Sequence, residues 1–288
     1  MIAPVYRSAR TKEIYERALN QLRVAFKTPP NDFDFLQNSK EVIEHIEGLE
    51  KSVNSKKIYY IAIVSHLKGV KEFEAVYPAY KAKMDGYNAA VAKQMAEQQL
   101  SPAEQEKFIS WPEVVAAREK IRTAAHDLMT YQDYVLVCLY TLIPPARVDY
   151  SPMHVVSEEP TGTTGNYLLV LPDGLTFIMN EYKTAHRYGQ ARVAVPKALE
   201  EVLREWLLLN PSGWLLCNSE GEPLTDIALS RRVIQIFQRH VGKPVGVCML
   251  RHSFVSWVRK DEMPFREQAE IARSMGHSVG MSQMYRRL

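Results

Sequence analysis

Two helix-start signals lie within ten residues of each other and divide the chain. In both Ser101-Pro-Ala-Glu104 and Ser110-Trp-Pro-Glu113, a glutamate follows a serine after three residues. This spacing predicts a capping box, in which the two side chains bond backbone N–H groups of the first helical turn. Because one helix does not begin twice in so short a stretch, we expect a helical domain over 1–100, a linker over 101–110 and a second domain over 111–288.

The first 100 residues predict helices throughout. Apolar residues recur at helical spacing from Ile14 to Phe26 and from Val42 to Leu49. A third apolar segment covers 56–67, and a fourth segment, rich in Ala, Lys and Gln, covers about 78–100. The sequence therefore predicts a small four-helix bundle.

The second domain is predicted to be mainly helical around a small sheet. Between Val148 and Pro196, short β-branched and aromatic runs alternate with turn residues, which is typical of strands. We expect a small antiparallel sheet with strands near 153–156, 167–170, 176–179 and 192–195. Helices are predicted over 111–127, 130–141, 197–208, 226–241, 248–259 and 265–275, and from about 281.

The composition excludes several classes of protein. With 46% hydrophobic and 24% charged residues, the chain is typical of globular proteins. The apolar run 134–143 is shorter than the roughly 20 residues of a membrane span. Three cysteines, Cys138, Cys217 and Cys248, are too few and too dispersed for a disulfide framework or a Cys-rich zinc site. The N-terminus lacks the apolar core of a signal peptide, so we expect an intracellular protein, with nucleus, cytoplasm and viral factory not distinguished.

Positive charge is concentrated toward the C-terminus. Eleven Lys and Arg face four Asp and Glu in residues 231–288, against twenty-five and twenty-nine before them, which gives net charges of +7 and −4. Such asymmetry is typical of a phosphate-binding surface, and a set of solvated helix faces is the alternative.

The chemistry-bearing motifs also lie mainly in the second domain. The chain has no Gly-rich phosphate loop, no metal-ligand spacing among its eight histidines and no Gly-x-Ser-x-Gly motif. Instead, Leu-Arg251-His-Ser-Phe is followed by Met-Gly-His277-Ser and then by Tyr285. Upstream, Arg147 stands in Pro-Pro-Ala-Arg-Val-Asp-Tyr at the end of a predicted helix, and Lys183 stands between two predicted strands.

In this order, the boxes resemble the catalytic signature of the tyrosine recombinase/integrase family, which includes phage integrases and Xer-type recombinases. The resemblance covers about residues 111–288, and the preceding bundle is similar to the family's core-binding domain in position and size. The Pro-Pro-x-Arg-x-Asp-Tyr box is similar to recombinases of viral and Crypton-like mobile elements. The resemblance implies a site-specific recombinase or integrase that cuts and rejoins DNA through a 3′-phosphotyrosyl intermediate, with no cofactor and no metal.

The resemblance also assigns roles. Arg147 and Arg251 would hold the non-bridging phosphate oxygens with paired, charge-assisted hydrogen bonds. Tyr285 would be the nucleophile, and Lys183 would give a proton to the departing 5′ oxygen. His277 would hydrogen-bond or orient the phosphate. Electrostatic stabilisation of this kind is usually the largest part of the acceleration.

Each assignment has a structural alternative. Arg251 alone would more often pair with a carboxylate, Arg147 with the C-terminus of a helix, and Tyr285 alone would be a packed aromatic residue. Near Lys183, the side chains of His186, Arg187 and Arg192 are also able to bind phosphate, so the basic residue of the hairpin stays open.

Three features depart from the family pattern. Cys248 stands where the family commonly has histidine, and a thiol is a poorer proton acceptor at neutral pH. Tyr285 follows His277 by eight residues, where nine is commoner. The sequence ends three residues after Tyr285, so we expect contacts between protomers to come from elsewhere.

Several functions remain open. The first is a recombinase acting as a homotetramer on two double-stranded DNA sites. The candidate DNA contacts for this function are Arg231, Arg232, Arg239, Arg259 and Lys260. The second is a degenerate recombinase that binds DNA without efficient catalysis, which Cys248 favours. A type IB topoisomerase-like enzyme and an all-helical scaffold are the remaining alternatives.

Overall fold

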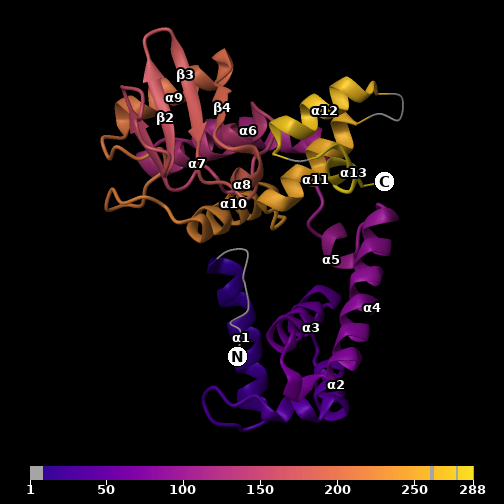
Figure 1. The fold of residues 1–288 in the computed structure, drawn as a ribbon. Helices are drawn as coiled ribbons and strands as arrows, with labels where there is room; N and C mark the ends of the chain where they lie inside the picture. Colours follow the sequence, from indigo (N-terminus) through magenta and orange to yellow (C-terminus); the bar gives the residue numbers. More distant parts are fainter. Residues whose placement is uncertain (1–8, 260–262, 277, 288) are drawn as a thin grey trace. The chain divides into compact units, whose positions relative to one another are not determined.

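The computed structural model describes residues 9–259, 263–276 and 278–287, and the chain forms two compact units, Met1–Glu97 and Gln98–Leu288 (Figure 1). Each unit has its own hydrophobic core. Among the described residues, none of the helices combines the length and the hydropathy of a membrane span.

The first unit is a bundle of helices. Its elements are α1 (Ala9–Ala25), the 3₁₀ helix η1 (Asp34–Gln37), α2 (Ser39–Gly48), α3 (Val53–Leu67), η2 (Lys71–Phe73) and α4 (Tyr77–Ala96). Helix α3 packs against α1 and α4. Leu22, Ile46, Ile63 and Tyr80 are fully buried, and the Tyr80 hydroxyl donates to the Leu36 carbonyl at 2.9 Å. The apolar spacing seen in the sequence thus forms the core of this unit.

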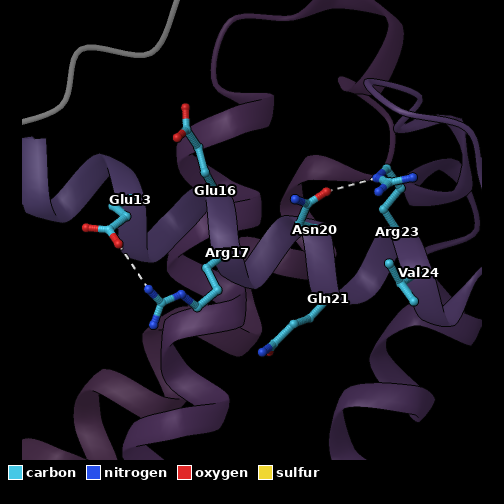
Figure 2. Close-up of a pocket in the computed structure, with 7 residues that line it drawn as sticks. All are labelled: Glu13, Glu16, Arg17, Asn20, Gln21, Arg23 and Val24. Carbon is cyan, nitrogen blue, oxygen red and sulfur yellow. Dashed lines mark hydrogen bonds and ion pairs between the residues drawn. The ribbon is translucent and has the colours of Figure 1, made fainter.

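One face of α1 remains polar and open to solvent. Figure 2 shows Glu13 paired with Arg17 at 3.0 Å and Arg23 bonded to Asn20 at 2.9 Å. This face has a depression, and all the residues that line it come from α1. The opposite face carries the buried Ala18 and Leu19, so α1 is an amphipathic helix and the depression is its solvent-facing side.

The second unit begins with helices whose start signals were read from the sequence. The capping boxes of Ser101 with Glu104 and of Ser110 with Glu113 both form, at the starts of α5 (Pro102–Gln105) and α6 (Trp111–Ala124). Helix α7 (Leu128–Thr141) follows, and its residues 132–140 are all buried. Because the buried residues lie on all sides of the helix, α7 is inside the unit, where it packs against α6 and α9 (Lys197–Leu209).

The sheet has four strands in the order β1-β2-β3-β4: β1 (Met153–Val156), β2 (Asn166–Leu171), β3 (Gly174–Met179) and β4 (Ala191–Ala194). The pairs β2–β3 and β3–β4 are antiparallel, but β1 runs parallel to β2. The sheet is therefore mixed, because the connection over 157–165 returns the chain to the start of β1 instead of making a hairpin. The short helix α8 (Ala185–Tyr188), between β3 and β4, was not predicted.

The remaining helices form the C-terminal part of this unit. They are α10 (Asp226–Val241), α11 (Val247–Val258), α12 (Phe265–Ser274) and α13 (Val279–Gln283). Thr225 caps α10 by accepting from the Ala228 N–H at 3.1 Å, and Gly242 ends it in a left-handed conformation. Figure 1 shows helices α11, α12 and α13 next to one another.

Candidate active site

Arg251 is a buried arginine in the middle of α11. Only 1% of it is exposed, and it donates to the carbonyls of Pro145 at 2.5 Å and Met275 at 3.0 Å. These carbonyls belong to the loop after α7 and to the turn after α12, so one guanidinium joins segments that are far apart in the sequence. A buried cation with fixed hydrogen bonds is pre-organised for an anionic ligand.

Arg147 reaches the same turn from the loop after α7. The buried Tyr140 fixes its backbone by donating to the Arg147 carbonyl at 2.8 Å. At Gly276 the backbone has φ +65°, which favours glycine, and a Cβ there would lie 3.7 Å from Arg147 Nη1. The Met275-Gly276 turn therefore brings Arg147 and Arg251 together.

The charge of Arg147 acts on Arg251, and both arginines act on a neighbouring carboxylate. Burial lowers the pKa of Arg251, and the charge of Arg147 adds to this effect, while a hydrogen bond with the Tyr285 side chain opposes it. Burial raises the pKa of Asp149, against the charges of Arg147 and Arg251. The site is thus a partly desolvated cationic centre with Asp149 as an acidic neighbour.

Tyr285 follows α13 and lies against Arg251 and His252 of α11. The Arg251 guanidinium carbon is 5.2 Å from the centre of the Tyr285 ring, and the ring of His252 stacks on it at 4.7 Å. Tyr285 is half-buried. The fold thus gathers Arg147, Arg251 and Tyr285 at one place, although the first and the last are 138 positions apart in the sequence.

Lys183 lies in the exposed turn before α8, and no contact within the described residues joins it to the two arginines. Its segment is nevertheless tied to that of Arg147 by the buried Asn166. The Asn166 side-chain N–H₂ group donates to the carbonyls of Asp149 and Glu181, both at 2.9 Å. Its oxygen accepts from the Glu181 N–H at 2.9 Å. The sequence analysis missed Asn166, since only the pairing of β2 with β3 shows its position.

Cys248 lies one turn before Arg251 on α11. Its side chain is partly exposed, yet burial by its surroundings raises the pKa of the thiol, against the charges of Arg251, Arg287 and Arg147. Cys248 is therefore a neutral thiol at neutral pH, next to the arginines, where the family pattern has an imidazole.

The predicted DNA contacts are dispersed. Arg231 is exposed on α10, whereas Arg232 forms an ion pair at 2.5 Å with the buried Asp133, and Arg239 lies 3.6 Å from the same carboxylate. Arg259 is only 6% exposed and donates to Gln268. The structure therefore gives Arg232 and Arg259 intramolecular partners.

Two predicted site residues, His277 and Lys260, lie outside the described residues. The neighbours of His277 on either side, Gly276 and Ser278, are described, and Ser278 caps α13 by accepting from the Met281 N–H at 3.2 Å.

No protein-family model and no curated protein matches this chain. Among solved structures, the XerH site-specific recombinase, bound to its difH substrate in a pre-cleavage complex, is similar with a TM-score of 0.54 and 17% identity, over 95% of this chain and 72% of that one. The XerA recombinase has a TM-score of 0.47 and 14% identity, over 98% and 89% of the two chains. The integrase of the Tn1549 transposon, in complex with transposon right-end DNA, has a TM-score of 0.40 and 12% identity, over 96% and 94%.

The likeness to XerH defines the class of fold. A largely helical chain with one small four-stranded sheet, aligned over 95% of its length, has the tyrosine recombinase fold. At 17% identity this likeness concerns the fold alone, and function has to be argued from the site.

Proposed function

We propose that this protein is a site-specific DNA recombinase or integrase that cuts and rejoins strands through a 3′-phosphotyrosyl intermediate. The observation that carries the proposal is the convergence of Arg147, Arg251 and Tyr285 at the Met275-Gly276 turn. Two guanidiniums next to a tyrosine suit one reaction well, which is attack of the hydroxyl on a phosphodiester whose charge the arginines stabilise.

In this reaction the Tyr285 Oη–P bond forms as the bond from phosphorus to the 5′ oxygen breaks. The tyrosine hydroxyl releases its proton to water, and the 5′ oxygen gains one. Arg147 and Arg251 hold the non-bridging oxygens throughout. Attack by the free 5′ hydroxyl of another strand reverses the chemistry, so the energy of the phosphodiester is kept and strands are rejoined.

We assign the proton for the 5′ oxygen to Lys183. It is exposed in the turn between β3 and α8, and Asn166 ties the start of this turn to the Arg147 loop. An exposed lysine has several rotatable bonds with which to turn toward a phosphate of the bound DNA. His277, two residues after Met275 in the chain, is assigned to orientation of the phosphate.

The proposed partner is double-stranded DNA, bound by a homotetramer that joins two sites. The helical unit is proposed to act as the core-binding-like domain and the unit with the site as the catalytic domain. On α10, Arg231 and Arg239 are the exposed candidates for phosphate contacts. The box around Arg147 supports an origin in a mobile or viral element.

Cys248 favours a second candidate function. A neutral thiol at this position neither carries a charge nor accepts a proton readily at neutral pH. A degenerate recombinase that binds DNA without forming covalent adducts would have this property. A type IB topoisomerase-like enzyme would form the adduct but would relax supercoils without joining partner duplexes.

The test is covalent trapping. Nicked suicide duplexes drawn from the DNA that flanks the gene are incubated with the protein, and the mixture is boiled in detergent. We expect a DNA adduct that survives boiling with the wild type and is absent with Tyr285→Phe.

Tyr167→Phe is the matched control, because Tyr167 lies on β2 and, among the described residues, its hydroxyl bonds only the Thr164 carbonyl, at 2.8 Å. This variant should form the adduct at the wild-type rate. Salt-sensitive DNA binding with no adduct on any duplex would leave the degenerate binding protein as the better account.

A further inference from the structure

His252 follows Arg251 on α11, and both of its ring nitrogens are engaged. Nδ1 lies 2.7 Å from the Tyr285 carbonyl, and Nε2 lies 3.3 Å from Nη2 of Arg287. Because arginine only donates, Nε2 accepts, and Nδ1 therefore carries the proton that it donates to Tyr285. Burial lowers the pKa of His252 to about 4, so this neutral tautomer persists through the neutral range. His252 thus has no nitrogen left for a phosphate.

Arg287 connects His252 to the start of the second unit. Its side chain is 9% exposed, and Nη2 also lies 3.4 Å from Oε1 of Glu104. Its backbone N–H donates to the Ser256 hydroxyl at 2.8 Å. The residue two positions after Tyr285 is therefore fixed by its backbone and by its side chain.

Glu104 is in turn held by its capping box. Burial alone would raise the pKa of Glu104, but hydrogen bonds from Ser101 and the charge of Arg287 lower it below its ordinary value. A charged Glu104 keeps Arg287 oriented toward His252. Beside it, the Gln98 side chain donates to the Gln283 carbonyl at 3.0 Å, which ties the end of α13 to the same segment.

We propose that Glu104, Arg287 and His252 form a relay of positioning residues that sets the place of Tyr285 against Arg251. This inference rests on the proposed function, since it concerns the nucleophile of that reaction. The relay acts on the backbone through the Tyr285 carbonyl and on the ring through stacking with His252. None of the three residues needs to touch DNA. A shift of about 1 Å in a reacting group costs up to 10²-fold in rate, so loss of the relay affects the rate of adduct formation more than binding.

Variants of His252 separate its two contacts. His252→Phe keeps a stacking ring and removes both hydrogen bonds, while His252→Asn keeps a donor near the place of Nδ1 and removes the ring. We expect His252→Phe to lower the rate of adduct formation at saturating protein by about 10- to 100-fold, with DNA affinity within about twofold of the wild type. His252→Asn should recover part of the loss.

Variants of Arg287 test the middle of the relay. Arg287→Gln should lower the rate about as much as His252→Phe, and Arg287→Lys, which keeps the charge beside Glu104, should recover part of it. The matched control is Arg266→Gln, because the Arg266 side chain is 90% exposed and pairs only with Glu270, within its own helix, among the described residues. This control should form adducts at the wild-type rate.

A measurement without DNA separates this inference from the proposed function. Hydrogen–deuterium exchange of the peptide over 279–287 is expected to be at least about tenfold faster in His252→Phe and Arg287→Gln than in the wild type. Unchanged exchange in both variants would overturn the relay, whatever the adduct assay shows. Wild-type rates of adduct formation in both variants would overturn it as well. If the wild type itself forms no adduct, the proposed function fails, and faster exchange in the variants still supports the relay as the anchor of this segment.

Discussion

Helices α10 and α11 both carry arginine, and the arginines of the two helices have different kinds of partner. On α10, Arg232 pairs with the buried Asp133 at 2.5 Å and Arg239 lies near the same carboxylate. On α11, Arg251 donates to the backbone carbonyls of Pro145 and Met275 and lies under the Tyr285 ring. The α10 candidates were chosen for their charge, and Arg251 for its place in an ordered motif. The comparison shows that the ordered motif selected residues that the fold brings together, whereas the charge count selected arginines that pair with a carboxylate elsewhere.

The largest effect is expected when the charge of Arg251 is removed. Arg251→Gln is expected to lower the rate of adduct formation by on the order of 10³-fold, because it removes a charged donor from the developing phosphate charge. Arg231→Gln, an exposed arginine of α10, should change that rate by less than about threefold, since one phosphate contact contributes mainly to affinity.

Because Arg251 is buried, its loss also threatens folding. Arg251→Lys keeps the charge without the paired geometry, and circular dichroism shows whether each variant is folded. A folded Arg251→Lys protein with wild-type rates would break the comparison.

The next effect concerns stability. Arg232→Gln leaves Asp133, only 2% exposed, without its principal cationic partner, and such a loss costs about 3–5 kcal/mol when the partner is fully buried. Arg232 is 27% exposed, so we expect a value at or below the lower end, about 2–3 kcal/mol, by urea unfolding. The adduct rate of the folded fraction should stay near that of the wild type. A stable but inactive Arg232→Gln protein would place α10 in the site.

Lys183→Ala should lower the rate of strand cleavage by about 10²-fold, the contribution of a general acid. A duplex with sulfur in place of the scissile 5′ oxygen tests the role directly, because a thiolate leaves without a proton. The variant and the wild type should cleave that duplex at similar rates. If the sulfur substrate gives no recovery, Lys183 is not the donor of this proton.

Protonation of His252 gives a smaller effect. Its pKa is lowered by burial to about 4, so as pH falls the unfolded chain, at about 6.5, takes the proton first. The contribution of His252 to the free energy of unfolding is therefore complete above about pH 6.5 and is lost as the pH falls toward 4. Between pH 7 and pH 5 this loss amounts to about 2 kcal/mol.

The pKa values of His66 and His240 are also lowered by burial, so the total change with pH is not specific to His252. The difference between the wild type and His252→Phe isolates this residue. Urea unfolding at pH 7 and pH 5 measures it, and equal pH dependence in the two proteins would contradict the assignment.

The smallest effect is expected at Cys248. Cys248→His replaces a neutral thiol beside Arg251 and Arg147 with a group able to accept or donate a proton near neutral pH. We expect the rate of adduct formation to rise several-fold, in single-turnover assays at pH 7.5. Cys248→Ser is the control, because it keeps the size and neutrality of the side chain. A rise with serine as well would show that the thiol itself hinders the site.

Much of the fold could be predicted from local signals. The capping boxes at Ser101 and Ser110 form as predicted, since they depend on residues three positions apart. The prediction of a wholly antiparallel sheet was wrong for β1, which runs parallel to β2. The choice between parallel and antiparallel pairing depends on the path of the connecting loop, which local residue patterns do not show. Helix α8 was missed because it is a single turn of four residues between β3 and β4, which is too short for a helical repeat of apolar residues.

The candidate site could be predicted only in part. The motifs named Arg147, Arg251 and Tyr285, and the structure brings these three together. The supporting residues Asn166 and Arg287 were missed, because they act on segments that become neighbours only in the folded chain. The charge count selected Arg232 and Arg259, whose partners Asp133 and Gln268 the sequence pattern does not reveal.

The central claim is that Tyr285 becomes covalently linked to DNA, and peptide mapping tests it most directly. A trapped adduct is digested with nuclease and trypsin, which cuts after Arg273 and Arg286, and the peptide over 274–286 is sequenced by mass spectrometry. The account predicts a nucleotide attached to the Tyr285 hydroxyl. A nucleotide on any other residue, or a boiled complex that releases all of its DNA, would contradict it.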